Sequence, residues 1–396
     1  MPQAKLNLAV AGSGAMAAYH VRRFRGFEGV EVIACYDRHG DRATRFAERE
    51  DIPQAYNSME ELMVKARPDA VAVAVADGEH YSVAREVIEA GAALFIEKPL
   101  TATLAEAEEL SEVRPWGGGA AREAPTPDSG RRKQSPVVVN FSKVNYPAVF
   151  GAVHLLRYGL LGPVRRLHIS YLQSWIVSTV WGEWWENPRW LWRISSSHRG
   201  GGALRDLGSH LFYLVLLILG DGEVTAARAW QEADRSLAAE SGYSCDLNDT
   251  FRAEVSVSGG AVAEVEASYA RPGNVNNVIL EAECEGGRVE VDLEKARGIV
   301  RTTRFEHGHQ GEGREASRST GPGGVSATGA RGRSAGAGPP PREHHFAKVF
   351  STYAEFVRLM SGDESLPHWI PPASMADGVA VQRMIEAAER WAARSA

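Results

Sequence analysis

The chain has 396 residues, of which 44% are hydrophobic and 24% are charged, so it can bury a large core and form two domains. Its formal net charge of −6 argues against a nucleic-acid partner. Three cysteines without short spacing indicate neither a disulfide framework nor a metal site and favour a reducing compartment. A strand pattern begins almost at the N-terminus and no apolar run is long enough to cross a bilayer, so we expect a cytoplasmic protein without membrane contact.

The first hundred residues alternate short apolar strand patterns with helical patterns. The strand patterns cover residues 6–12, 30–37, 69–76 and 93–99. This alternation predicts βαβ units in a doubly wound parallel sheet with helices on both faces, a Rossmann-like α/β domain. One more helix should follow, with Thr103 and Glu106 as a capping box.

The pattern changes from about residue 137 to strands separated by turns, which predicts an α+β domain with a mostly antiparallel sheet. We therefore expect a first domain over residues 1–123 and a second over residues 137–396. Flexible inserts should occupy about 114–136 and 305–342, where Gly, Pro and charge replace apolar periodicity. The strand patterns of the second domain cover residues 164–173, 225–231, 251–258, 261–270, 277–293 and 298–304.

The stretch VAGSGAMA follows a strand pattern and opens a helical one, with Gly12, Gly14 and Ala17 in the spacing G-x-G-x-x-A. Gly12 permits a tight turn and Gly14 lets a pyrophosphate approach the backbone, at a helix N-terminus that favours an anion. A plain structural turn is the alternative. We expect a dinucleotide to contact the residues of this loop: Gly12, Ser13, Gly14, Ala15 and Met16.

The second strand pattern ends at Asp37. A carboxylate at this position would bind the adenosine ribose hydroxyls and repel a 2′-phosphate, which favours NAD. The neighbouring Arg38 leaves NADP as an alternative, and helix capping is the structural alternative for Asp37.

The stretch FIEKPL places Glu97, Lys98 and Pro99 directly after an apolar strand. Ligands of a doubly wound sheet lie outside the carboxyl ends of its strands, so this strand should deliver both charges to the cofactor crevice. Lys98 can then meet a hydroxyl or carbonyl of a substrate. If side chains alternate, Glu97 points away from the cleft and anchors the turn. A solvated charge pair is the alternative.

The stretch RGGGALRDLGSH leads into a strongly apolar helical pattern. Asp206 and His210 are four residues apart, which predicts that they share one face of that helix. Removal of hydride from a carbinol carbon requires a base for the hydroxyl proton, a role that suits His210. Asp206 would orient the ring or contact a neighbouring hydroxyl, and Lys98 would stabilise the developing alkoxide. A capping or surface pair is the alternative.

Together these motifs resemble the glucose-fructose oxidoreductase, inositol dehydrogenase and rhizopine-catabolism (Gfo/Idh/MocA) family of oxidoreductases. The resemblance covers nearly the whole chain outside the inserts. It implies an N-terminal Rossmann domain and a C-terminal domain whose large open sheet forms a homodimer or homotetramer. It also implies NAD(P)-dependent oxidation or reduction of sugars and cyclitols, with a catalytic group that consists of Lys98, Asp206 and His210.

The resemblance further places Ala76, Asp77, His80 and Glu97 beside the cofactor. The sequence departs from the family pattern in three places. Residues 75–77 read Val-Ala-Asp where Thr-Pro-Asn is usual, Tyr213 stands where an aspartate is frequent, and Lys143 stands where an arginine is common. The substrate therefore stays open.

Six of the ten tryptophans lie between residues 175 and 192. Indole rings stack on the C–H faces of sugars, so this segment is either the wall of a carbohydrate pocket or the packing of an interface. We expect the substrate to contact Lys143, Trp175, Trp192, Arg193, Asp206 and His210.

Three functions agree with these patterns. The first is a dehydrogenase that transfers hydride between NAD(P) and a sugar, an inositol or a related polyol. The second is a glycoside-cleaving enzyme that oxidises its substrate transiently with a bound NAD. The third is a dinucleotide-binding regulatory protein without catalysis, which the complete set of Lys98, Asp206 and His210 disfavours.

Overall fold

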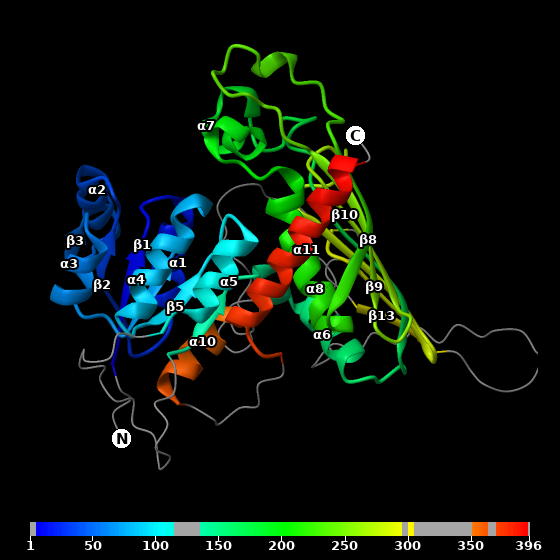
Figure 1. The fold of residues 1–396 in the computed structure, drawn as a ribbon, viewed down its shortest axis with the longest axis horizontal. Coiled ribbons are helices and arrows are strands. Elements are labelled where there is room, and N and C mark those ends of the chain that lie inside the picture. Colours follow the sequence, from blue (N-terminus) through cyan, green and yellow to red (C-terminus); the bar gives the residue numbers. More distant parts are fainter. Residues whose placement is uncertain (1–4, 115–134, 295–299, 305–350, 363–369, 395–396) are drawn as a thin grey trace, which may run out of the picture. The chain divides into compact units, whose positions relative to one another are not determined.

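The computed structural model describes residues 5–114, 135–294, 300–304, 351–362 and 370–394 (Figure 1). Apart from their ends, both expected inserts lie outside these ranges. The chain divides into two compact units. The first unit combines the chain up to Phe141 with a C-terminal segment that ends at Gln382, and the second holds the chain from Ser142 together with the end of the last helix from Arg383.

The first unit contains a six-stranded sheet in which every neighbouring pair of strands is parallel, in the order β3-β2-β1-β4-β5-β6. This arrangement confirms the expected Rossmann-like sheet. The short edge strand β3 and helix α3 were not expected. Its strands are β1 (Leu6–Ala11), β2 (Val30–Tyr36), β3 (Gln54–Tyr56), β4 (Ala70–Val73), β5 (Ala93–Ile96) and β6 (Val137–Val139). Its helices are α1 (Ala15–Phe24), α2 (Gly40–Glu50), α3 (Met59–Lys65), the 3-10 turn η1 (Asp77–Glu79), α4 (His80–Glu89), α5 (Leu104–Glu112) and α10 (Thr352–Ser361).

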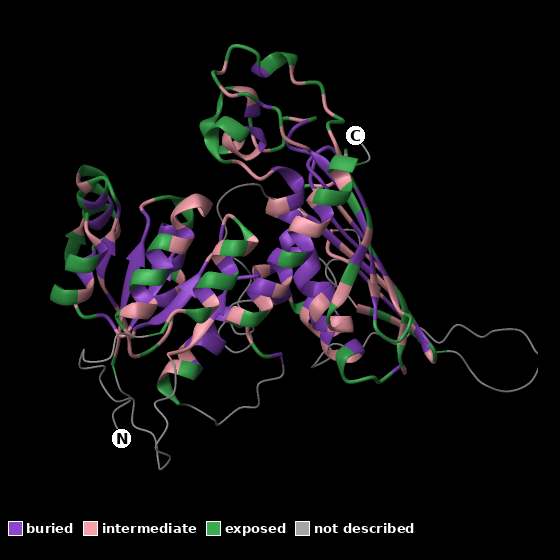
Figure 2. Ribbon diagram, in the orientation of Figure 1, coloured by how far each residue is buried: buried purple, intermediate pink, exposed green. Residues whose placement is uncertain are grey.

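The central strands of this sheet are buried along their whole length, as the purple ribbons of Figure 2 show. Residues 70–73 and 93–96 are all apolar and all buried, because helices cover both faces of a parallel sheet. The predicted capping box is present, since the Thr103 hydroxyl accepts from the Glu106 N–H and the Glu106 carboxylate accepts from the Thr103 N–H. Local sequence therefore determines where this helix begins.

Helix α10 packs in the core of the first unit, although residues 137–396 were expected to form the second domain. Its Tyr353 and Phe356 are fully buried with Phe24 of α1 and Phe95 of β5. The helix α11 (Met375–Arg394) continues from the first unit into the second. The C-terminal helices thus divide between the units.

The second unit contains a seven-stranded sheet in the order β13-β12-β11-β7-β10-β9-β8. Only the β7–β10 pair among these strands is parallel, so the expected mostly antiparallel sheet is confirmed. Its strands are β7 (Val164–Leu172), β8 (Gly222–Trp230), β9 (Thr250–Val257), β10 (Val262–Ser268), β11 (Asn277–Cys284), β12 (Gly287–Asp292) and β13 (Val300–Arg304). The other elements are η2 (Ser142–Asn145), α6 (Pro147–Arg157), η3 (Trp184–Glu186), α7 (Pro188–Leu191), η4 (Trp192–Ile194), η5 (Ser196–His198), η6 (Leu204–Gly208), α8 (Ser209–Leu219) and η7 (Ser236–Ala238).

One face of this sheet is apolar and buried, because alternate residues of each strand point the same way. Leu167, Ile169 and Tyr171 of β7 lie on this face, and the helices α6 and α8 pack against it (Figure 1). The opposite face carries charged side chains such as Arg166 and Glu264. No helix in the described part of the chain is long and apolar enough to cross a membrane.

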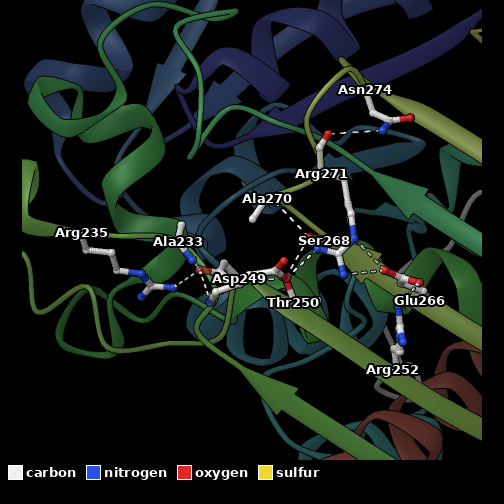
Figure 3. A network of polar contacts seen from close by, with 11 residues as sticks. Ala233, Arg235, Asp249, Thr250, Arg252, Glu266, Ser268, Ala270, Arg271 and Asn274 are labelled. Atoms are coloured by element: carbon white, nitrogen blue, oxygen red, sulfur yellow. Dashed lines mark hydrogen bonds and ion pairs between the residues drawn. The ribbon is translucent and has the colours of Figure 1, made fainter.

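A buried carboxylate joins the start of β9 to the loop that follows β8 (Figure 3). Asp249 is fully buried and accepts hydrogen bonds from the N–H groups of Glu232 and Ala233, from the Thr250 hydroxyl and from the Arg235 guanidinium at 2.9 Å. The neighbouring Asn248 accepts from the N–H groups of Ala203 and Leu204. Asp249 therefore fixes the segment that caps the helix carrying Asp206.

We expect Asp249→Ala to lower the free energy of unfolding by about 3 kcal/mol or more, because it leaves the Arg235 guanidinium buried without its carboxylate. Urea unfolding measures this change. The matched control is Asp234→Ala, which removes an exposed aspartate that bonds only within its own turn and should change stability much less. Equal losses in both variants would contradict this role for Asp249.

Candidate active site

The glycine-rich loop between β1 and α1 has the geometry that a dinucleotide requires. Gly12 adopts φ +106°, and a Cβ atom there would lie 2.4 Å from the Ala74 carbonyl oxygen, so only glycine fits. Gly14 precedes α1, and a Cβ atom there would meet nothing within 4 Å. No side chain caps the N–H groups of α1. Gly14, Ala15 and Met16 are exposed, so the loop is open to an anion at the helix N-terminus.

The Asp37 carboxylate lies at the end of β2 next to this loop. It accepts hydrogen bonds from the Ser13 hydroxyl and from the His39 N–H at 3.0 Å. The second contact lies just before α2 but does not cap the helix, because no side chain caps the N–H groups of α2. Arg38 forms an ion pair with Glu79. Arg38, the neighbour of Asp37, is thus paired with the Glu79 carboxylate.

The loop after β4 holds Ala76, Asp77 and His80, which were predicted to lie beside the cofactor. Ala76 is exposed and Asp77 is partly exposed, so both remain accessible. His80 is fully buried, and its ring lies between the carbonyl oxygens of Pro99 (2.8 Å) and Val75 (3.3 Å). A fully buried ring cannot touch a dinucleotide. We therefore replace the direct contact predicted for His80 with an indirect role, which ties this loop to the Lys98–Pro99 turn.

Glu97 and Lys98 follow β5, and the peptide bond between Lys98 and Pro99 is cis. The side chain of Glu97 is only 12% exposed, and its Oε1 accepts from the Asn140 amide at 2.8 Å and lies 3.2 Å from His20 Nε2. Burial raises the pKa of Glu97, but His20, Asn140 and Lys98 lower the pKa by more, so it lies below its usual value. Glu97 therefore anchors the turn as an ionised group rather than contacting a cofactor.

In the second unit, Asp206 lies in a π-helical turn, Leu204–Gly208, that leads into α8. The expected regular α-helix begins only at Ser209, so Asp206 and His210 do not share a simple α-helical face. Such turns are rare and occur frequently at functional sites. The turn starts at Gly202, where φ is +63° and a Cβ atom would lie 2.7 Å from the Asn248 amide. Asn248 therefore requires a glycine there.

Two donors hold the same oxygen of Asp206. The buried Tyr269 hydroxyl donates to Oδ2 at 2.8 Å, and Arg193 Nε lies 3.3 Å from the same atom. Burial and the charge of Asp206 raise the pKa of Tyr269 well above its usual value, so the phenol keeps its proton and remains a donor. This arrangement fixes the direction of the Asp206 carboxylate.

The buried Tyr171 on β7 lies among the predicted substrate-binding residues of this unit. Its ring centre lies 6.1 Å from that of His210 and 4.3 Å from Lys143 Nζ, which also lies 5.2 Å from the Tyr146 ring. Burial, followed by Tyr146 and Asp206, raises the pKa of Tyr171 well above its usual value. The neutral phenol donates to Asn276 at 2.6 Å. Lys143, with 6% of its surface exposed, supports Tyr171 more than it offers a charge to a substrate.

The tryptophan-rich segment packs beside Asp206. Trp175 is 1% exposed and contacts Tyr269, Trp184 and Trp190, so it supports the site rather than offering a face to a substrate as predicted. Trp192 is partly exposed, and its ring and that of Trp190 lie against the Arg193 guanidinium. The segment therefore reaches Asp206 through Arg193.

Tyr171, Tyr269 and Asn248 were not anticipated from the sequence. Both tyrosines continue the alternation of buried residues at the carboxyl end of a strand, after Ile169 and Ala267 respectively. A tyrosine in such a position has an apolar ring for the core and a hydroxyl for the strand end. That pattern could have identified them.

Residues 6–114 match the profile of an oxidoreductase family with an NAD-binding Rossmann fold (GFO_IDH_MocA). Residues 152–297 match the GFO/IDH/MocA C-terminal domain. The chain belongs to the GFO/IDH/MocA oxidoreductase family. The resemblance inferred from the motifs is thereby confirmed.

Curated relatives in this family match the chain over part of its length. An uncharacterized oxidoreductase from Synechocystis is 28% identical over 222 residues, 56% of this chain and 53% of that protein. A levoglucosan dehydrogenase from Pseudarthrobacter phenanthrenivorans is 24% identical over 241 residues, 57% of this chain and 55% of that protein. The chain thus spans about half the length of these relatives.

Solved structures resemble the fold over nearly the whole chain. The structure of a levoglucosan dehydrogenase in complex with NADH and levoglucosan has a TM-score of 0.74 at 20% sequence identity, with 99% of this chain and 98% of that chain covered. An NAD-binding oxidoreductase from Klebsiella pneumoniae reaches the same TM-score at 21% identity. At this identity the likeness shows the fold.

The cofactor of the Rossmann domain is NAD, as the family profile states. The residues present fit it, because the loop at Gly12 and Gly14 is open, the N-terminus of α1 has no side-chain cap and Asp37 stands at the end of β2. Within the described residues, no group of three His, Cys, Asp or Glu side chains is placed to hold a metal ion.

We expect Asp37→Ala to weaken NADH binding by about tenfold or more, because it removes hydrogen bonds between a carboxylate and the ribose hydroxyls. NADPH binding should not weaken, since the repulsion of the 2′-phosphate is also removed. Fluorescence titration with both nucleotides measures this. The control is Asp41→Ala, which removes an exposed aspartate of α2 that pairs only with Arg45. Loss of affinity for NADPH as large as that for NADH would contradict the assignment.

Proposed function

We propose that this protein is an NAD-dependent dehydrogenase that transfers hydride between the nicotinamide and a CH–OH group of a sugar, an inositol or a related polyol. The observation that carries the proposal is the polar cluster of the second unit. There Asp206 is held by two donors and His210 lies against Tyr171, next to a tryptophan-rich segment. The names of relatives such as the levoglucosan dehydrogenase support a carbohydrate substrate.

Bound NAD supplies the acceptor of the hydride. Ser13, Gly14, Ala15 and Met16 would hold its pyrophosphate, and Asp37 its adenosine ribose. We propose NAD rather than NADP because the Asp37 carboxylate is kept in place by Ser13 and His39. Arg38 is paired with Glu79, which supports the same preference.

His210 takes the proton of the reacting hydroxyl in this proposal. An imidazole suits this role because its ordinary pKa lies close to neutral pH. Asp206, held by Tyr269 and Arg193, would bind a neighbouring hydroxyl and stabilise the imidazolium that forms. Lys98 would stabilise the developing alkoxide. In this mechanism His210 removes the proton, Asp206 stabilises the imidazolium and Lys98 stabilises the alkoxide.

Substrate selection in this proposal depends on Arg193 and Trp192, with Trp190 as a support for the guanidinium. Two indole rings hold the guanidinium, with centres 5.1 Å and 4.9 Å from its carbon. Indole faces suit the C–H faces of a sugar ring, and the remaining guanidinium N–H groups suit its hydroxyls. The substrate that these features favour is therefore rich in hydroxyl groups and has an apolar ring face.

We expect Lys98→Ala and His210→Asn each to lower kcat by on the order of 10² or more, the usual effect of losing one acid–base or electrostatic group. NADH affinity should change much less. The double variant should lose less than the product of the single losses, because both residues serve one transition state. Reduction of NAD in the presence of a panel of sugars and cyclitols identifies the substrate and measures kcat.

The outcomes separate the alternative functions. Cleavage of a glycoside without net formation of NADH would favour the transient-oxidation mechanism. Near-normal turnover in both single variants would contradict the proposed catalytic group. NADH binding without oxidation of any sugar or cyclitol would favour a regulatory protein.

We further propose that the charged face of the seven-stranded sheet forms a contact between two copies of the chain. A hollow of about 370 Å³ on this face is lined by charged side chains of both signs. Arg166 and Glu264 form an ion pair at 3.8 Å, and their side chains are 70% and 57% exposed, so this pair is accessible to a second copy. The ionisable residues of the hollow are Arg166, His168, Glu264, Glu281, Glu283 and Arg288.

We expect a dimer or tetramer that dissociates more readily at high salt, because exposed ion pairs are screened. Sedimentation velocity at low and high sodium chloride measures this. Glu264→Arg should favour the monomer at low salt, whereas Glu48→Arg, on α2 of the first unit, should not. A monomer at all concentrations and salt levels would contradict the proposal.

A further inference from the structure

Three polar groups of the first unit form a buried chain that ends at Glu97, the residue before the proposed catalytic Lys98. The Tyr353 hydroxyl and His20 Nδ1 are 2.7 Å apart, and His20 Nε2 is 3.2 Å from Glu97 Oε1. His20 is fully buried and Tyr353 is 1% exposed. The proposed chemistry uses neither residue. A histidine placed in a core with two polar partners requires an explanation.

The hydrogen-bonding capacity of the groups assigns the direction of the chain. The Glu97 carboxylate can only accept, so His20 must present Nε2–H to it. In the tautomer that carries its proton on Nε2, the Nδ1 atom accepts, and the Tyr353 hydroxyl donates to it. Burial raises the pKa of Tyr353 well above its usual value, in agreement with a phenol that keeps its proton. The phenol and Nδ1 satisfy each other in this arrangement, while Nε2 faces Glu97 Oε1 at 3.2 Å without the geometry of a good hydrogen bond.

Glu97 transmits the constraint to the lysine because it is the residue before Lys98. The Lys98 N–H lies 3.4 Å from Glu97 Oε2, and the Asn140 amide donates to Oε1 from the end of β6. His20 and Asn140 thus hold one oxygen, while the other faces the backbone of the lysine. Displacement of the carboxylate would move the start of the turn that carries Lys98.

Tyr353 is itself held by aromatic packing from a distant part of the sequence. Its ring centre lies 4.9 Å from that of Phe95 and 5.1 Å from that of Phe24. It belongs to α10, while His20 belongs to α1 and Glu97 follows β5. The tyrosine hydroxyl is therefore fixed by the packing of α10 in this core.

We propose that His20 and Tyr353 are positioning residues for Lys98, which act through Glu97. The inference rests on the proposed catalytic role of Lys98, but the placement of the lysine can be measured without a substrate. Helix α10 is then a functional part of the cofactor domain rather than only a cover for its core.

The first experiment labels the seven lysines by reductive methylation with ¹³C-formaldehyde and observes the dimethyl-lysine signals by NMR in the full chain with NADH. Lys98→Arg identifies the signal of Lys98. We expect Tyr353→Phe, which removes one hydroxyl and keeps the ring, to displace that signal by more than a linewidth. The signals of Lys5 and Lys65, two surface lysines paired with Glu31 and Glu61, should not move.

The control variant is Tyr19→Phe. Tyr19 is 41% exposed on the same helix as His20 and packs against the Tyr353 ring, but its hydroxyl has no part in the chain of polar groups. We expect the Lys98 signal to stay in place in this variant. A Lys98 signal that stays in place in Tyr353→Phe, or moves equally in Tyr19→Phe, would overturn the proposal. His20→Phe should produce a larger displacement, and His20→Gln, which keeps a donor, a smaller one.

The second experiment uses a substrate that the unmodified enzyme oxidises. Tyr353→Phe should lower kcat about three- to tenfold, the usual effect of one lost hydrogen bond, with KM for NAD unchanged. In a Lys98→Ala background the same substitution should have no further effect on kcat. Equal effects in both backgrounds would overturn the proposal. If no substrate is oxidised, the proposed function fails while the NMR result still decides the placement of Lys98.

Discussion

A carboxylate removed from water must be surrounded by donors, and this requirement organises both units of the chain. Glu97, Asp206 and Asp249 are each reached by donors from elements far away in sequence. Such contacts define the positions of the strand end at Lys98, the turn at Asp206 and the start of β9. The apolar cores hold the sheets together, but the carboxylates determine where the polar ends of the elements lie.

The three carboxylates differ in what their donors leave available. Asp249 is fully buried and its partners are backbone N–H groups, a hydroxyl and Arg235, so it serves structure. Asp206 is held by Tyr269 and Arg193, and its side chain remains 24% exposed. Glu97 lies between these cases, with one oxygen held from the core and the other facing the lysine backbone. The carboxylate that lies closest to the proposed chemistry, Asp206, is therefore the most exposed of the three, and Asp249, the farthest from it in role, is the least exposed.

The sequence predicted the features that depend on local patterns. The buried strands β1, β2, β4 and β5 follow from apolar runs, and the loop at Gly12 follows from the spacing of its glycines. Contacts between distant residues could not be predicted in this way. Tyr269 and Asp206 are 63 residues apart, and Tyr353 and His20 are 333 residues apart, so no local pattern relates them.

Two errors have a common cause, because the sequence pattern of an element does not determine its partners. The helix α10 lies within the residues that were expected to form the second domain, because helical periodicity does not reveal that this helix packs on α1. Trp175 was assigned to the substrate because it belongs to a tryptophan-rich segment, yet a segment with many aromatic rings must bury some of them to keep others in place.

The same reasoning separates the tryptophans by function. Trp175 forms the support, because it is buried against Tyr269 and lies stacked with Trp190. Trp190 and Trp192 hold Arg193, which contacts Asp206. A change in this segment would therefore act on substrate selection and on the orientation of Asp206 together. Selectivity and proton transfer are coupled in the proposed mechanism because one arginine takes part in both.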